Sequence, residues 1–102
     1  MRRRYIAVEV DAEREIDRRD LLDAVSNSLL RLFGEYGASQ AELALIEHEP
    51  RTNRAVFRCN HKALEMAKAS IIALREVDHE KAAAQITYVS GTLKSIRERL
   101  TG

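Results

Sequence analysis

The central segment of the chain, residues 41–60, reads AELALIEHEPRTNRAVFRCN. Residues 50–53, Pro-Arg-Thr-Asn, have the composition of a turn, because proline fixes its own φ and Asn tolerates turn conformations. Residues 41–49 read as a strand, and residues 54–60 read as the strand that returns from the turn. The sequence therefore predicts a β-hairpin in the middle of the chain.

Amphipathic helices are predicted on both sides of this hairpin. Residues 18–36 predict a helix because apolar side chains recur at steps of three and four, at Leu22, Val25, Leu29, Leu32, Phe33 and Tyr36. Asp17 is its expected N-cap, with Asp20 three residues on, and Gly37 suits the left-handed position after its end. Residues 61–75 predict a second helix that is capped by Asn60 and carries an apolar stripe of Leu64, Ala67, Ile71 and Leu74.

Two further strands and a third helix complete the pattern. Residues 4–10 alternate, with Ile6, Val8 and Val10 on one face and Tyr5, Ala7 and Glu9 on the other. Residues 82–90 predict the fourth strand because their second half is β-branched and aromatic. Ser90-Gly91-Thr92 breaks this strand and opens a short helix with Leu93, Ile96 and Leu100 inward.

This order, β-α-β-β-α-β plus a C-terminal helix, predicts an α+β fold. It is the ferredoxin-like arrangement of RNA-recognition modules, in which two helices cover one face of a four-stranded antiparallel sheet. The second strand is apolar on both sides, with Leu43 and Leu45 alternating with Ala44 and Ile46. Such strands are buried on both faces. We therefore expect the C-terminal helix or a protein partner to cover the second face.

Length and composition limit the class of protein. The 102 residues are enough for one domain, residues 1–102, and 45% of them are hydrophobic, as in globular chains. No apolar run approaches the ~18–20 residues that span a bilayer, and the N-terminal residues lack the pattern of a signal peptide. The single cysteine, Cys59, excludes an internal disulfide and a cysteine-based zinc site. We expect a cytoplasmic protein.

Catalytic patterns are weak. His48, His61 and His79 lack metal-ligand spacing, and no metal site is expected. Cys59 and His61 could share a strand face, which makes a Cys–His nucleophile conceivable, although a buried cysteine at a strand end fits better. Ser90-Gly91-Thr92 ahead of Lys94 could bind an anion weakly at a helix start, but an ordinary N-cap explains it equally well.

The charge distribution is more informative than the formal net charge of +1. Basic residues cluster at Arg2–Arg4, at Arg51 and Arg54, at Arg58 and Lys62, and at Lys94, Arg97 and Arg99. The paired aromatic residues with which RNA-recognition modules stack bases are missing, since Phe57 fits the core and only Tyr5 lies on the first strand. The pattern favours phosphate contacts with a folded RNA.

Four stretches match a known family in order and separation: Arg3–Ile6, Leu30–Gly37 (LRLFGEYG), Arg58–His61 (RCNH) and Val89–Lys94 (VSGTLK). The chain resembles the archaeal ribonuclease P protein component 2 family, which is related to a eukaryotic subunit of ribonucleases P and MRP. The resemblance runs from about residue 3 to residue 100.

The resemblance implies a non-catalytic protein subunit of ribonuclease P, whose RNA removes the 5′ leader from precursor tRNA with Mg²⁺. It implies pairing with component 3, a TIM-barrel-like subunit, in a dimer of heterodimers, and it assigns no cofactor to the protein. Charge and motif position predict these RNA-binding residues: Arg2, Arg3, Arg4, Arg58, Asn60, His61, Lys62, Ser90, Thr92, Lys94 and Arg97. For Tyr36 and Gly37 a structural role, at the helix end and in the core, is expected.

Two other classes stay open at this point. One is a ferredoxin-like regulatory module that binds a protein or small ligand and no RNA. The other is a small hydrolase that uses Cys59 and His61.

Overall fold

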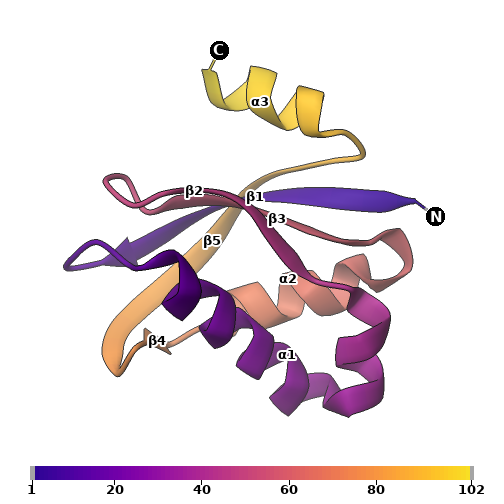
Figure 1. Ribbon diagram of the computed structural model, residues 1–102, viewed down its shortest axis with the longest axis horizontal. Coiled ribbons are helices and arrows are strands. Elements are labelled where there is room, and N and C mark those ends of the chain that lie inside the picture. The colour runs from indigo at the N-terminus through magenta and orange to yellow at the C-terminus, as the bar shows by residue number, and fades with distance from the viewer. Residues whose placement is uncertain (1, 102) are drawn as a thin grey trace.

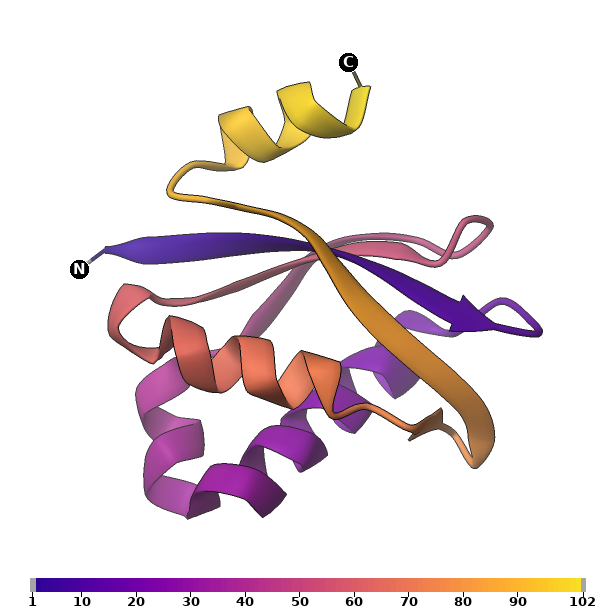
Figure 2. The same cartoon turned by 180° about the vertical axis from the view of Figure 1, so that it is seen from behind.

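The computed structural model describes residues 2–101. The chain runs through nine elements (Figures 1 and 2): β1 (Arg3–Ala12), α1 (Arg18–Ala41), β2 (Ala44–Glu49), β3 (Arg54–Asn60), the 3-10 helix η1 (His61–Ala63), α2 (Leu64–Ile72), β4 (Glu76–Val77), β5 (Glu80–Ser90) and α3 (Leu93–Thr101). The strands form an antiparallel sheet in the order β2-β3-β1-β5-β4. The central four follow the predicted ferredoxin-like order.

The prediction of a four-stranded sheet misses β4. Asp78 and His79 take positive φ values of 49° and 65°, and they turn the chain so that Glu76 and Val77 pair with the start of β5. A strand of two residues is too short to carry a periodic sequence pattern. The added strand lengthens one edge of the sheet and leaves the order of the other four unchanged.

The sheet is covered on both faces, as the two-sided apolar pattern predicted. On the inner face, Ile6, Val8 and Phe57 pack with the apolar stripes of α1 and α2. On the outer face, Ala7 and Val56 pack against Ile96 of α3. Figure 1 shows α3 on one side of the sheet and the α1–α2 layer on the other. The C-terminal helix is therefore a cover of the second face.

The prediction that the first helix ends at residue 36, with Gly37 left-handed, is wrong: the positive φ falls at Gly34, where α1 bends and continues. Gly34 has φ 74° and ψ 179°, a conformation that favours glycine, and the helix then resumes as far as Ala41. Gly37 is buried inside this second part, where a Cβ would stand 2.7 Å from the Phe33 Cβ. The bend turns Tyr36 outward, and its side chain is 79% exposed. The expectation of a core role for Tyr36 is wrong.

The predicted helix starts are confirmed. Asp17 caps α1 by accepting a hydrogen bond from the Arg19 amide at 3.1 Å, and Asn60 caps η1 by accepting one from the Lys62 amide at 3.0 Å. The second helix is shorter than residues 61–75, because its first turn is 3-10 and α2 ends at Ile72.

A candidate nucleic-acid interface at one end of the sheet

Strand register brings two distant basic segments, residues 2–4 and 58–62, together at one end of the sheet, next to the end of β5. Arg3 pairs with Asn60, and Tyr5 pairs with Arg58 on one side and with Ser90 on the other. The His61 amide donates to the Arg2 carbonyl oxygen at 3.0 Å, which ties the N-terminal arm to the start of η1. We call this surface the basic end; it consists of Arg2, Arg3, Arg4, Arg58, Asn60, His61 and Lys62.

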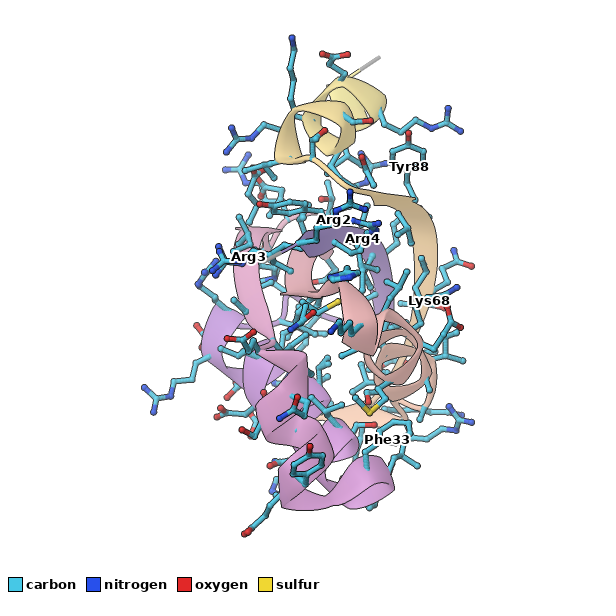
Figure 3. All side chains as sticks on the ribbon, turned by 90° about the vertical axis from the view of Figure 1, so that its right-hand side faces the viewer. Arg2, Arg3, Arg4, Phe33, Lys68 and Tyr88 are labelled. Atoms are coloured by element: carbon cyan, nitrogen blue, oxygen red, sulfur yellow. The ribbon has the colours of Figure 1, made fainter. Side chains whose placement is uncertain are left out.

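The charged groups of the basic end are available to a ligand. Arg2, Arg3 and Lys62 are exposed, and Arg58 is half-buried. Within residues 2–100, none of these four forms an ion pair with a carboxylate. Figure 3, which looks onto this end, shows Arg2, Arg3 and Arg4 at the level of the sheet, between α3 and the α1–α2 layer. A surface of unpaired guanidinium and ammonium groups suits an anionic partner.

The polar side chains of the basic end are engaged within the protein. The Asn60 side chain donates from Nδ2 to Glu42 Oε1 at 3.3 Å, while its Oδ1 forms the cap of η1. The His61 ring Nδ1 lies 3.2 Å from the Arg2 carbonyl oxygen. These contacts position the backbone that carries Arg2 and Lys62.

The junction of β5 and α3 lies beside the basic end. A Cβ at Gly91 would stand 3.5 Å from Arg4 Nη1. The Thr92 amide donates to Ser90 Oγ, and the Ser95 amide donates to Thr92 Oγ1, each at 3.2 Å. These two N–H groups are therefore used inside the protein, which favours the N-cap interpretation over an anion site. Lys94 is exposed, and its Nζ lies 4.0 Å from Glu98 Oε1.

The remaining basic residues lie away from the basic end. Arg97 of α3 pairs with Glu47 of β2, and the Arg99 guanidinium lies 5.1 Å from the centre of the Tyr88 ring. Arg54 pairs with Glu9 at 3.2 Å, and Arg51 lies in the turn at the far end of β3. Within the described residues, Arg97 is therefore engaged by a carboxylate of β2, unlike Arg2, Arg3, Arg58 and Lys62.

Acidic residues gather where β1 ends. An open hollow there is lined by carboxylates and a few basic side chains: Asp11, Glu13, Glu15, Asp17, Asp20, Asp78 and Glu80, with Arg14, Arg75 and Lys81. Since β1 begins at the basic end, the two signs of charge lie at opposite ends of one strand.

Cys59 is poorly placed for nucleophilic chemistry. Its side chain is 1% exposed and belongs to the inner core, and burial raises the pKa of the thiol to about 11. The nucleophile in such chemistry is the thiolate, so a buried thiol with a raised pKa is inert at neutral pH. In the described part of the chain, no three His, Cys, Asp or Glu side chains are grouped to hold a metal ion.

An exposed apolar patch surrounds the bend in α1, and periodicity alone missed it. We call Leu30, Leu32, Phe33 and Tyr36 the bend patch; their side chains are between 38% and 79% exposed. Figure 3 shows Phe33 in the helix layer, on the opposite side of the sheet from α3. The signal in the sequence was a pair of glycines inside a helical apolar period. Among the described helices, none is both long and apolar enough to cross a membrane.

Comparisons with known proteins agree on one family. The model of the Rpp14/Pop5 family matches residues 4–101. A ribonuclease P protein component 2 from Archaeoglobus fulgidus is 33% identical over 99 residues, which cover 96% of this chain and 87% of that protein. The component 2 protein of Pyrococcus furiosus is 28% identical over 98 residues, which cover 96% of this chain and 82% of that protein.

A solved structure resembles the fold. A chain in the cryo-EM structure of yeast ribonuclease MRP superimposes with a TM-score of 0.75 and 16% sequence identity, over 98% of this chain and 92% of that chain. At a sequence identity this low, the match shows that the two folds are similar and nothing more. At this coverage the match includes the sheet, the α1–α2 layer and α3.

Proposed function

The chain belongs to the Rpp14/Pop5 family, and from this membership we propose that it is a protein subunit of ribonuclease P. In this role it works in a complex with an RNA and with other protein subunits. The RNA, with Mg²⁺, supplies the chemistry that removes the 5′ leader from precursor tRNA. The protein supports the fold of that RNA and acts in the cytoplasm.

The observation that carries the proposal is the basic end. Arg2, Arg3, Arg4, Arg58 and Lys62 come from two distant parts of the sequence, and the register of β1 with β3 brings them to one end of the sheet. Phosphate contacts of this kind fix the position of a protein on RNA without reading its sequence. They suit a folded RNA that is recognised by shape.

The mechanism is electrostatic. Folding of the catalytic RNA brings phosphates close together, and Mg²⁺ or protein cations must offset their repulsion. The guanidinium groups of the basic end neutralise some of these phosphates and release counterions. The folded RNA is then populated at a lower Mg²⁺ concentration. Lys94 extends this basic surface at the start of α3, where Ser90 and Thr92 cap the junction beside Arg4.

The bend patch provides a surface for a protein partner. Four apolar side chains within seven residues stay exposed around Gly34, on the helix layer. Clustered exposed apolar residues mark protein interaction sites. Component 3 is the partner that we assign to this patch, which leaves the basic end free for RNA.

The test is cleavage of precursor tRNA by a cognate ribonuclease P RNA at limiting Mg²⁺, with and without this chain plus component 3. We expect the pair to lower the Mg²⁺ requirement, and we expect the chain alone to cleave nothing. If the pair changes nothing while the RNA is active at high Mg²⁺, a regulatory module without RNA becomes the better interpretation. If the chain alone cleaves and Cys59→Ala abolishes that activity, a hydrolase is indicated.

A further inference from the structure

Two tyrosines, Tyr5 and Tyr88, lie at diagonal positions of neighbouring strands on the outer sheet face, beneath α3. Ala7 of β1 pairs with Tyr88 of β5, and Tyr5 lies two residues before Ala7 on the same face. Both rings pack in the small outer core with Ala7, Val56 and Ile96. Figure 3 shows Tyr88 next to α3. Aromatic rings on one face of a sheet are the surface on which proteins stack unpaired bases.

The cover over these rings is attached by few contacts. Among the side chains of residues 93–100, Ile96 is the only one that is fully buried. Leu93 adds a half-buried apolar contact. The polar contacts are the ion pair of Arg97 with Glu47, the part-buried hydrogen bond between Tyr88 Oη and Ser95 Oγ at 3.3 Å, and Arg99 over the Tyr88 ring. A helix of nine residues is also marginal by itself, because it lacks enough internal hydrogen bonds to offset its nucleation. Release of α3 would expose this small outer core and leave the larger inner core in place.

The covered face is continuous with the basic end. Tyr5 has two cross-strand neighbours: Arg58 of the basic end on β3, and Ser90 on β5. An RNA strand whose phosphates contact Arg58 would lead its next bases over Tyr5 and Tyr88. In the closed form, the Arg99 guanidinium lies over the Tyr88 ring, where a stacked base would lie. A base and α3 therefore compete for the same ring.

We propose that α3 is a displaceable cover, and that Tyr5 and Tyr88 beneath it form a second RNA site that stacks unpaired bases when α3 leaves the sheet. The proposal rests on the proposed function in that its ligand is RNA. It adds a site for single-stranded RNA to the folded-RNA contacts of the basic end. It also assigns α3 a regulatory role, since the apparent affinity of this site is reduced by the fraction of molecules in which it is open.

The experiment compares two single substitutions on α3 in the full chain. Ile96→Ser removes the buried anchor, and Leu100→Ser is the matched control on a residue outside the outer core. Binding of a short fluorescent oligoadenylate is followed by anisotropy. We expect Ile96→Ser to bind about tenfold more tightly than the unmodified chain, as for a cover that is open in roughly a tenth of the molecules. Leu100→Ser should bind as the unmodified chain does.

A second comparison shows whether the rings are the site. Tyr5→Leu and Tyr88→Leu, added together to Ile96→Ser, should abolish the gain, because stacking needs the aromatic faces. A gain that survives both changes would overturn the proposal, and so would the absence of any gain. Should Ile96→Ser unfold the chain, hydrogen exchange of the unmodified protein decides: oligoadenylate should accelerate exchange in α3, and unchanged or slower exchange would refute the cover.

Failure of this inference is distinguishable from failure of the proposed function. The unmodified chain is also titrated with ribonuclease P RNA over a range of salt concentrations. Steep, salt-dependent binding to that RNA without any gain in Ile96→Ser rejects the cover and leaves the subunit role intact. Absence of binding to both RNAs rejects the subunit role, and the cover with it.

Discussion

Arg58→Gln should weaken binding to ribonuclease P RNA, and it should do so in a salt-dependent way. Arg58 lies on the outer face of β3 beside Tyr5, it forms no ion pair within residues 2–100, and glutamine keeps much of its length without the charge. The matched control is Arg51→Gln, which removes the same charge from the turn at the other end of β3.

The magnitude follows from the number of cations at the site. The basic end and the neighbouring helix start provide six: Arg2, Arg3, Arg4, Arg58, Lys62 and Lys94. Each neutralised phosphate contributes about −0.7 to −0.9 to the slope of log K against log salt, so six contacts give a slope of about −4 to −5. Arg58→Gln should make this slope shallower by about 0.7–0.9 and lower the affinity about fivefold, or on the order of 1 kcal/mol.

The assay is filter binding of folded, labelled ribonuclease P RNA at several salt concentrations, for the unmodified chain and both variants. Thermal melts check that the variants remain folded. The reasoning is refuted if Arg51→Gln loses as much affinity as Arg58→Gln, because a general effect of net charge would then explain both. It is also refuted if Arg58→Gln weakens binding with an unchanged slope.

Three further predictions concern the fold and its titratable groups. Asn53→Ala should lower the free energy of unfolding by about 2–4 kcal/mol in urea, because Asn53 Oδ1 accepts from the buried Ile16 amide at 3.0 Å, Nδ2 donates to the Arg14 carbonyl at 3.1 Å, and φ is 53°. Asn53→Gly should recover about 1 kcal/mol of this loss, because glycine accepts a positive φ. A loss of less than about 1 kcal/mol in Asn53→Ala would contradict the reasoning. Iodoacetamide should alkylate Cys59 far more slowly in the folded chain than in urea at mildly alkaline pH, since burial raises the pKa of its thiol to about 11; equal rates would show that the site is open. Burial, and then the Arg18 charge, lowers the pKa of His48 from its usual 6.5. As the pH falls, His48 therefore binds a proton in the unfolded chain at a higher pH than in the folded chain, and the unfolding free energy should decrease below about pH 6.5. His48→Gln should flatten this dependence in urea titrations at several pH values, and an unchanged slope would assign it to other groups.

Much of the fold could be predicted because apolar residues recur along the sequence with the simple periods of strands and helices. Ile6, Val8 and Val10 alternate with Tyr5 and Ala7, and the structure places the two sets in the inner and the outer core. The bend in α1 was harder, because Gly34 and Gly37 are both compatible with a left-handed backbone. The backbone dihedral angles of Gly34 and the packing of Gly37 inside the second part of the helix show that the bend falls at Gly34. Tyr36 kept the helical period in the sequence, but the bend turns it outward.

The candidate site was predictable in its charges but not in its geometry. Arg3, Arg58 and Ser90 are visible as polar residues of separate segments, and strand register, which a single sequence does not specify, brings them together. Arg97 was grouped with the same surface because it follows Lys94 by three residues. Its ion pair with Glu47 depends on how α3 crosses the sheet, which helical periodicity does not determine. RNA contact by any of these residues stays a prediction.

The separation of charge along β1 makes this nearly neutral chain an electric dipole. A polyanion attracts the basic end and repels the acidic hollow, so an approaching RNA turns the protein before the two surfaces touch. The range of this steering depends on salt: the screening length is about 8 Å at physiological ionic strength and about 30 Å at 0.01 M. The latter is close to the 36 Å longest extent of the molecule. In dilute salt the whole protein is thus oriented at a distance, whereas in the cell its orientation is selected only in the last moments of an encounter.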